Sequence, residues 1–218
     1  MSVAASMTAL VVDVVAWVVA PPRCAACDAR VPPASAFCPA CASTVERPAR
    51  DDVSLTGAFV YGGAVARAIV RLKYERRPDL ARPLGDLLWR ALAPDAHDLH
   101  NSVVIPVPLH VARLAERGFN QSAIIACRIA RRLGASWLPL ALERTRDTMQ
   151  QATLDRDGRI ANVAGAFRVR QAERLRGRAV LLIDDVRTTG ATMDACAAVL
   201  EACGAASVKQ AVVALAGP

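Results

Sequence analysis

The sequence predicts an α/β protein, in which a parallel sheet is flanked by helices and a small cysteine-rich ribbon lies N-terminal to it. Three observations support this prediction. Apolar runs typical of buried strands alternate with helical patterns between residues 55 and 218. One of these strands runs into two adjacent aspartates and a glycine-led helix, "VLLIDDVRTTGATM" at 180–193. Four cysteines in two C-x2-C pairs precede the alternating region.

The composition fits one domain of usual size with a small appendage. The chain has 218 residues, of which 22% are charged and 54% are hydrophobic, so a disordered chain is excluded. Its formal net charge is +7, and the only lysines among its 27 basic residues are Lys73 and Lys209. An arginine-rich protein suits phosphates, nucleic acid or acidic lipid, although a solvated basic surface gives the same charge.

The N-terminal segment, residues 1–22, is apolar but short. Its run "LVVDVVAWVVA" at 10–20 contains Asp13 and has 11 residues, whereas a membrane helix needs about 20. No lysine or arginine precedes the run, which argues against a secretory signal. We therefore expect a buried or docking segment, no transmembrane segment and a cytoplasmic protein.

The cysteine pattern predicts a structural metal site in residues 23–45. Two C-x2-C pairs separated by ten residues can place four thiolates in a tetrahedron around Zn²⁺. An iron–sulfur cluster and unligated cysteines are the alternatives. Asp28, after the first pair, tolerates the left-handed backbone that such turns use, whereas Ala42 after the second pair does so less readily. The expected ligands are Cys24, Cys27, Cys38 and Cys41.

Residues 46–54 are polar and contain proline, so they are expected to link the ribbon to a main domain at 55–218. Apolar runs predict strands, and amphipathic patterns that end at glycine predict helices. The expected strands cover 57–62, 102–109, 136–142, 178–184 and 207–216, and the expected helices cover 63–74, 79–92, 120–134 and 191–204.

The turn after strand 179–183 contains residues that are suited to bind a ligand. In parallel sheets, ligands bind outside the carboxyl ends of the strands, and the start of the next helix offers free N–H groups to a phosphate. Gly190 allows close approach of the backbone, and Thr188, Thr189 and Thr192 add hydroxyl donors. Two adjacent carboxylates suit a vicinal diol or a metal. Together these groups describe a site for a ribose 5-phosphate.

The sequence resembles the ComF family, a competence-associated branch of the type I phosphoribosyltransferases. "VLLIDDVRTTGAT" is similar to the signature that binds phosphoribosyl pyrophosphate (PRPP) in the wider fold family. "IPVPLHVARLAERGFNQS", "RTRDTMQQATL" and "RIANVAGAF" occur in the branch in this order, behind a cysteine ribbon. The resemblance implies the type I phosphoribosyltransferase fold for residues 55–218.

The resemblance also implies roles for particular residues. Asp184 and Asp185 match the pair that contacts the ribose hydroxyls, and Arg113 and Arg117 follow the strand that leads into the pyrophosphate loop. Lys73 matches a lysine common in the branch. The expected phosphate loop comprises Arg187, Thr188, Thr189, Gly190, Ala191 and Thr192, and the possible cover-loop residues are Gln151, Arg159 and Asn162.

The expected function is a phosphoribosyltransferase that uses Mg²⁺ with PRPP and an unknown nitrogenous acceptor. Thr188 stands where purine-salvage relatives carry an acidic residue, which argues against a purine acceptor. The alternative is a non-catalytic adaptor that binds single-stranded DNA or competence proteins, although a chain with 4% aromatic residues offers few stacking platforms. Because the two aspartates repel each other, we also expect alanine at either position to leave the unliganded fold no less stable.

Overall fold

The computed structural model describes residues 21–49, 54–146 and 165–216. Its centre is a five-stranded sheet with the order β1-β7-β6-β2-β3, in which every neighbouring pair is parallel. The strands are β1 (Leu55–Val60), β2 (Val103–Pro106), β3 (Ser136–Trp137), β6 (Ala179–Arg187) and β7 (Ser207–Leu215). The predicted α/β class is therefore confirmed.

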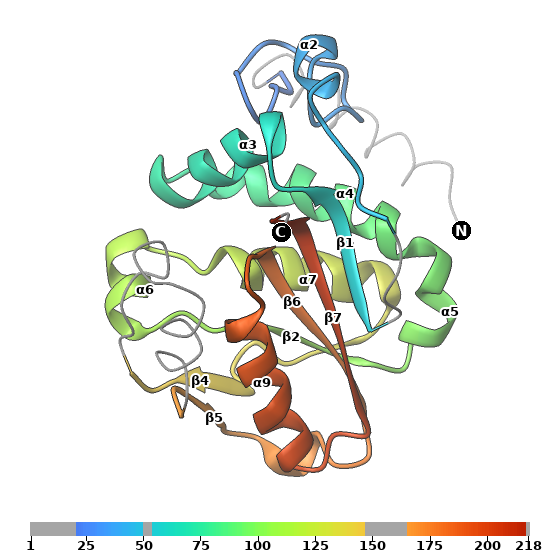
Figure 1. Ribbon diagram of the computed structural model, residues 1–218, viewed down its shortest axis with the longest axis vertical. Helices are drawn as coiled ribbons and strands as arrows, with labels where there is room; N and C mark the ends of the chain where they lie inside the picture. Colours follow the sequence, from blue (N-terminus) through green and yellow to red (C-terminus); the bar gives the residue numbers. More distant parts are fainter. Residues whose placement is uncertain (1–20, 50–53, 147–164, 217–218) are drawn as a thin grey trace, which may run out of the picture.

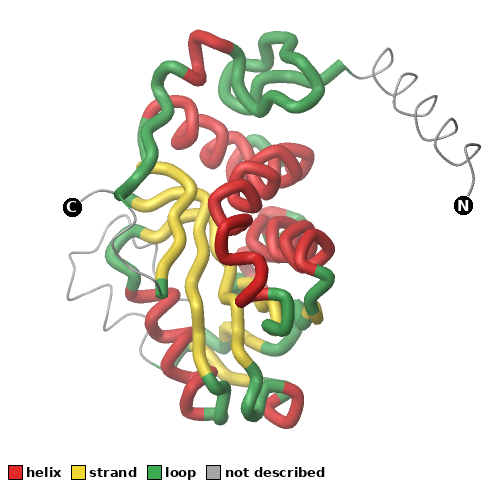
Figure 2. Tube along the Cα trace, turned by 90° about the vertical axis from the view of Figure 1, so that its right-hand side faces the viewer, coloured by secondary structure: helices red, strands yellow, loops and turns green. Residues whose placement is uncertain are grey.

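Helices cover both faces of this sheet (Figure 1). One face packs against α4 and α7, which follow β1 and β2, and the other face packs against α9, which follows β6. Figure 2 shows the strands between helices on both sides, with the loop-rich cysteine ribbon at one end of the molecule. The longer helices are α3 (Gly63–Tyr74), α4 (Ala81–Leu92), α7 (Gln121–Leu133) and α9 (Ala191–Ala202).

The predicted strand over 136–142 is wrong in its extent. The chain pairs with β2 through β3 and a bond from Leu138 N to Val104 O, then turns at Leu138–Ala141, where Ala141 N donates to Leu138 O. Pro139 has no N–H to donate to a sheet, which explains the break. The following residues form β4 (Leu142–Arg144), which pairs antiparallel with β5 (Phe167–Val169) in a separate hairpin.

Several short helical elements were not predicted from the sequence. The segment that contains His97 and His100 is one of these, because residues 93–99 form two short helical turns. A two-turn helix, α6, also lies between β2 and α7. The short elements are α2 (Pro39–Ala42), η1 (Pro78–Leu80), η2 (Ala93–Asp95), α5 (Ala96–Leu99), α6 (Val111–Arg117) and η4 (Ala172–Arg174).

The core consists of two apolar layers, one on each face of the sheet. The first layer joins α3, α4 and α7 to the sheet through residues such as Ile69, Leu84 and Ile125. The second joins α9 and the β4–β5 hairpin to the sheet through residues such as Leu182 and Cys196. Among the described helices, none is both long and apolar enough to cross a bilayer.

Candidate active site

The two predicted aspartates lie at the carboxyl end of the central strand β6. This strand is longer than predicted, because its backbone keeps pairing with β7 through Asp184 and on to Arg187. The two carboxylates lie close enough that each changes the pKa of the other. Asp185 is buried, with 2% of its surface exposed, whereas Asp184 is half-buried. The pair therefore consists of one core carboxylate and one that is partly exposed.

Lys73 is the charged partner of the buried aspartate. It lies in the last turn of α3, and its Nζ is 2.6 Å from Asp185 Oδ2. The lysine side chain is 21% exposed, so the contact is a largely desolvated ion pair. Asp185 therefore makes a core contact, and removing its carboxylate would leave a buried ammonium group without its partner. This contact argues against the expectation that alanine at this position leaves the unliganded fold no less stable.

Two polar residues at the start of α7 complete this network. Gln121 Nε2 donates to Asp185 Oδ1 at 3.3 Å, and Ser122 Oγ donates to Asp184 Oδ1 at 2.6 Å. Both side chains are buried. Asn120 caps the helix, since its Oδ1 accepts from the N–H of Ser122, and its Nδ2 donates to Val107 O, which ties α7 to the end of β2. The network thus joins three elements that are distant in the sequence.

These contacts shift the pKa values of the two aspartates in opposite directions. Burial and the neighbouring Asp185 carboxylate raise the pKa of Asp184 from 3.8 to about 7. Burial acts in the same direction on Asp185, but the ammonium group of Lys73 outweighs it and lowers the pKa of that carboxyl below its usual value. Burial alone would lower the pKa of Lys73, and the two aspartate charges raise it instead.

We expect Asp184→Asn to stabilise the unliganded protein, and to do so more at pH 8 than at pH 5. The folded protein binds the Asp184 proton more tightly than the unfolded chain does, so the stability that this proton supplies is lost progressively as the pH rises from 3.8, the ordinary value, to about 7. Since one pKa unit corresponds to about 1.4 kcal/mol, the gain at pH 8 should exceed the gain at pH 5 by roughly 2–3 kcal/mol. Urea unfolding of both proteins at pH 5 and pH 8 measures this difference, and an equal gain at both pH values would contradict it.

The loop between β6 and α9 has the geometry of an anion cradle that is partly covered. Gly190 has φ 87° and begins α9, and Thr189 Oγ1 is buried with no hydrogen-bond partner among the described residues. The guanidinium group of Arg187 lies where a Cβ on Gly190 would stand, and it pairs with Asp194 at 3.1 Å. Gln210 Nε2 also donates to Asp194 Oδ1 at 3.0 Å. Thr188 is exposed, and Ala191 is buried in the first turn of the helix.

The two arginines of α6 differ in position. Arg117 Nη1 donates to Gln121 Oε1 at 2.7 Å, and its guanidinium lies 5.8 Å from the centre of the Tyr74 ring. Arg117 is therefore connected to Asp185 through Gln121. Arg113 instead pairs with Glu116 on the same helix. The structure brings Arg117 into the network but leaves Arg113 outside it.

The expected cover-loop residues, Gln151, Arg159 and Asn162, lie outside the described residues. The chain that leads to and from their segment is described, and it forms the β4–β5 hairpin. Thr145 N donates to Ala166 O at 2.8 Å, which holds the two ends of the segment together. The hairpin packs against α9, whose first residues belong to the loop that carries Gly190.

The four ribbon cysteines form one cluster. Their sulfur atoms lie within 4.8 Å of one another, and Cys27 Sγ is 3.7 Å from Cys38 Sγ. A tetrahedral zinc site with Zn–S bonds of about 2.3 Å requires sulfur separations of about 3.8 Å, so the cluster has the dimensions of a zinc site. Burial opposes ionisation of Cys24, but hydrogen bonds from backbone N–H groups lower its pKa to about 7, whereas burial raises the pKa of Cys41 to about 12. Asp28 has φ 62°, as expected for this turn.

Comparisons with known proteins support the resemblance found in the sequence. Residues 120–217 match the phosphoribosyl transferase domain family. DNA utilization protein YhgH of Escherichia coli K12 is 35% identical over 68% of this chain and 66% of its own length, slightly less than two thirds. The Salmonella typhimurium protein of the same name is 31% identical over equal shares. Competence protein F of Haemophilus influenzae is 27% identical over 86% of this chain and 82% of its own length.

The chain belongs to the ComF family of phosphoribosyltransferase-like proteins. In this ComF protein, the structure adds residues that sequence reasoning left without a role. Gln121 and Ser122 are the final letters of the motif "RGFNQS", but only the fold shows that they reach the aspartates. Asp194, which pairs with Arg187, and Gln210, which donates to Asp194, carry no comparable sequence signal.

Proposed function

We propose that this protein binds PRPP at the carboxyl end of β6 and transfers its phosphoribosyl group to a nitrogenous acceptor. The observation that carries the proposal is the difference in environment between the two aspartates. Lys73 and Gln121 hold Asp185 as an ionised group inside the core, while Asp184 remains half-buried beside it. Above pH 7 the Asp184 carboxylate accepts hydrogen bonds from the ribose hydroxyls, so PRPP affinity rises with pH through about 7.

The neighbouring loop supports a site for the 5-phosphate. Its backbone N–H groups and the unpartnered hydroxyl of Thr189 are donors, and the positive end of the α9 dipole favours an anion. The guanidinium of Arg187 already lies over Gly190, where it adds a permanent positive charge. Asp194 holds this guanidinium in place and neutralises part of its charge until a phosphate enters.

In the proposed reaction, the C1–O bond to pyrophosphate breaks with its electron pair leaving on oxygen, and the acceptor nitrogen donates a lone pair to C1. Mg²⁺ that binds together with PRPP would neutralise part of the negative charge on the departing pyrophosphate. Arg117, which Gln121 and the ring of Tyr74 hold in place, donates to the departing pyrophosphate. Asp184 lowers the barrier further by positioning the sugar, because a C1 atom that is fixed in place needs less reorganisation before the acceptor attacks it.

Pyrophosphate release from Mg²⁺-PRPP in a screen of candidate nitrogenous bases tests this function. We expect one class of acceptor to support release, and Arg117→Ala to reduce the rate roughly 100-fold, as expected for the loss of one charged donor. Glu116→Gln on the same helix removes only a surface pair and serves as the control. PRPP binding without release for any acceptor would restrict the function to binding.

A second candidate is a nucleic-acid adaptor. The relatives are named for DNA utilization and competence, and Tyr74 is 68% exposed beside Arg117, an arrangement that suits a stacked base next to a phosphate. We expect single-stranded DNA affinity to fall steeply with salt, to survive Asp184→Asn and to weaken by about 1–3 kcal/mol in Tyr74→Ala. Absence of binding at physiological salt would rule out this candidate.

A further inference from the structure

The cysteine ribbon and the candidate active site contact the same helix, α3, which lies between them (Figure 1). At its N-terminal end, Ala64 packs with Cys24 and Cys41, and its N–H donates to Thr44 Oγ1 at 3.0 Å. Gly63 has φ 48°, and a Cβ there would clash with the carbonyl group of Thr44. The ribbon is therefore seated directly on the start of this helix.

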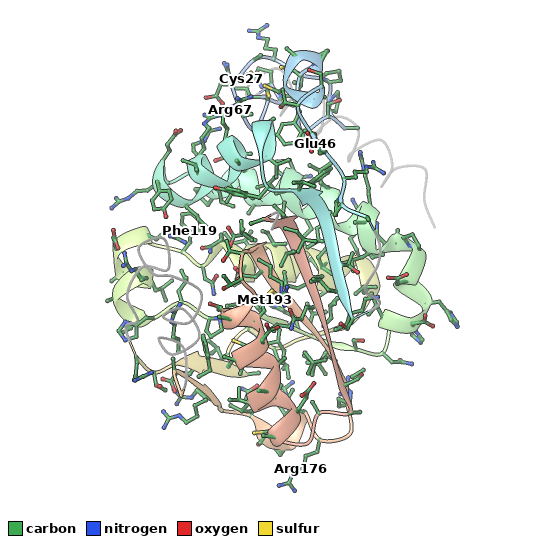
Figure 3. The ribbon with its side chains drawn as sticks, viewed as in Figure 1. Cys27, Glu46, Arg67, Phe119, Arg176 and Met193 are labelled. Carbon is green, nitrogen blue, oxygen red and sulfur yellow. The ribbon has the colours of Figure 1, made fainter. Side chains whose placement is uncertain are left out.

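Further along α3, two more contacts join the ribbon to the helix. Arg67, which Figure 3 shows on the part of α3 that faces the ribbon, donates to Cys41 Sγ at 3.7 Å. Arg71 Nη1 donates to Ala25 O at 3.2 Å. Ala25 lies between the first two cysteines and belongs to the main core, together with Ile69 and Leu72 of the helix. The ribbon thus contacts α3 along most of its length.

Asp28 makes the contact nearest to the active site. It follows the first cysteine pair in a left-handed turn, and its carboxylate forms ion pairs with Arg71 and, at 3.3 Å, with Arg77. These two arginines flank Lys73 in the sequence. Residues two apart on a helix lie on nearly opposite faces, so Arg71 faces the ribbon while Lys73 faces Asp185. A shift of this turn toward or away from the ribbon moves Lys73 relative to Asp185.

The geometry points to Asp28 as a positioning residue for Lys73, through which the metal-bound form of the ribbon holds Lys73 on Asp185. The four thiolates fix the turn that presents Asp28. Asp28 in turn holds the final turn of α3 through Arg71 and the chain just after the helix through Arg77. The metal acts only by ordering this turn. The consequence for PRPP affinity rests on the proposed function, whereas the Lys73–Asp185 contact does not.

The test uses the fact that the chain contains only two lysines, Lys73 and Lys209. Protein labelled with ¹³Cε-lysine gives two signals in an NMR spectrum, and Lys209, which pairs with Asp95 at 2.6 Å, is the internal reference. The main variant is Asp28→Asn, because asparagine keeps the left-handed turn but loses the charge. Asp79→Asn removes the surface partner of Arg77 and is the matched control.

We expect Asp28→Asn to retain its zinc and to shift or broaden the Lys73 signal while the Lys209 signal stays unchanged. Amide hydrogen exchange over residues 71–75 should become at least several-fold faster, and Asp79→Asn should match the wild type. If the wild type binds Mg²⁺-PRPP, the affinity should fall about three- to tenfold in Asp28→Asn. An unchanged Lys73 signal and unchanged exchange in Asp28→Asn would overturn the proposal, whether or not PRPP binds.

Discussion

Cys38→Ser should abolish zinc binding and destabilise the ribbon by several kcal/mol. Four thiolates close enough for a tetrahedral site contribute folding free energy on the order of 10 kcal/mol in small zinc modules. The loss should extend beyond residues 23–45, because Ala25 belongs to the main core and Arg71 binds its carbonyl group. Metal analysis should find one zinc per chain in the wild type and less than about 0.1 in the variant.

Cys203→Ser is the matched control for this experiment. Cys203 is half-buried at the end of α9 and takes no part in the four-cysteine cluster, so this variant should keep its zinc. Protein that is purified under reducing conditions without chelator and contains no zinc would contradict the prediction. The absorption band of an iron–sulfur cluster would show that the site holds a different metal centre.

Asp185→Ala should destabilise the unliganded protein by about 3 kcal/mol, because it leaves the ammonium group of Lys73 desolvated and unpaired. This is near the lower end for a broken buried pair, since one fifth of the lysine side chain still reaches solvent. In a chain of this length the melting temperature should fall by roughly 6–12 °C. Thermal unfolding monitored by circular dichroism measures the change.

The pair between Lys209 and Asp95 provides the comparison for Asp185→Ala. Its Nζ–Oδ2 distance is also 2.6 Å and Lys209 is 22% exposed, but a third of the Asp95 side chain reaches solvent. Water can therefore replace the Asp95 carboxylate, and Asp95→Ala should cost less than about 1 kcal/mol. The double variant Lys73→Met/Asp185→Leu should recover much of the lost stability, because it removes both charges. Equal effects of Asp185→Ala and Asp95→Ala would mean that the buried pair has no special role.

Local sequence patterns predicted most of the architecture. Helix α3 was predicted at its observed bounds, because its apolar spacing and the glycines before it are local signals. The extension of β6 past Asp184 was not predicted, since it depends on pairing with β7, and a carboxylate in a strand is favoured only by such tertiary context. The break at Pro139 was visible in the sequence, but the antiparallel partner of the following residues lies more than twenty positions away.

The same limit applies to the candidate site. The aspartates, the loop with Gly190 and the cysteine cluster each lie within a short stretch, so their residue types and spacing suffice to find them. Lys73 was singled out only by resemblance, and its pairing with Asp185 depends on how α3 packs over the sheet. Gln121 and Asp28 reach their partners across 64 and 43 positions respectively, distances over which a single sequence carries no pairing signal.

Calorimetric titration of Mg²⁺-PRPP into the wild type, Asp184→Ala and Asp95→Ala at pH 8 tests the central claim most directly. If Asp184 accepts a charged hydrogen bond from a ribose hydroxyl, its loss costs about 1.5–3 kcal/mol, which weakens binding roughly 10- to 150-fold. Asp95→Ala should bind like the wild type. Failure of the wild type to bind PRPP, or equal affinity of the wild type and Asp184→Ala, would contradict the assignment of the aspartates to the sugar.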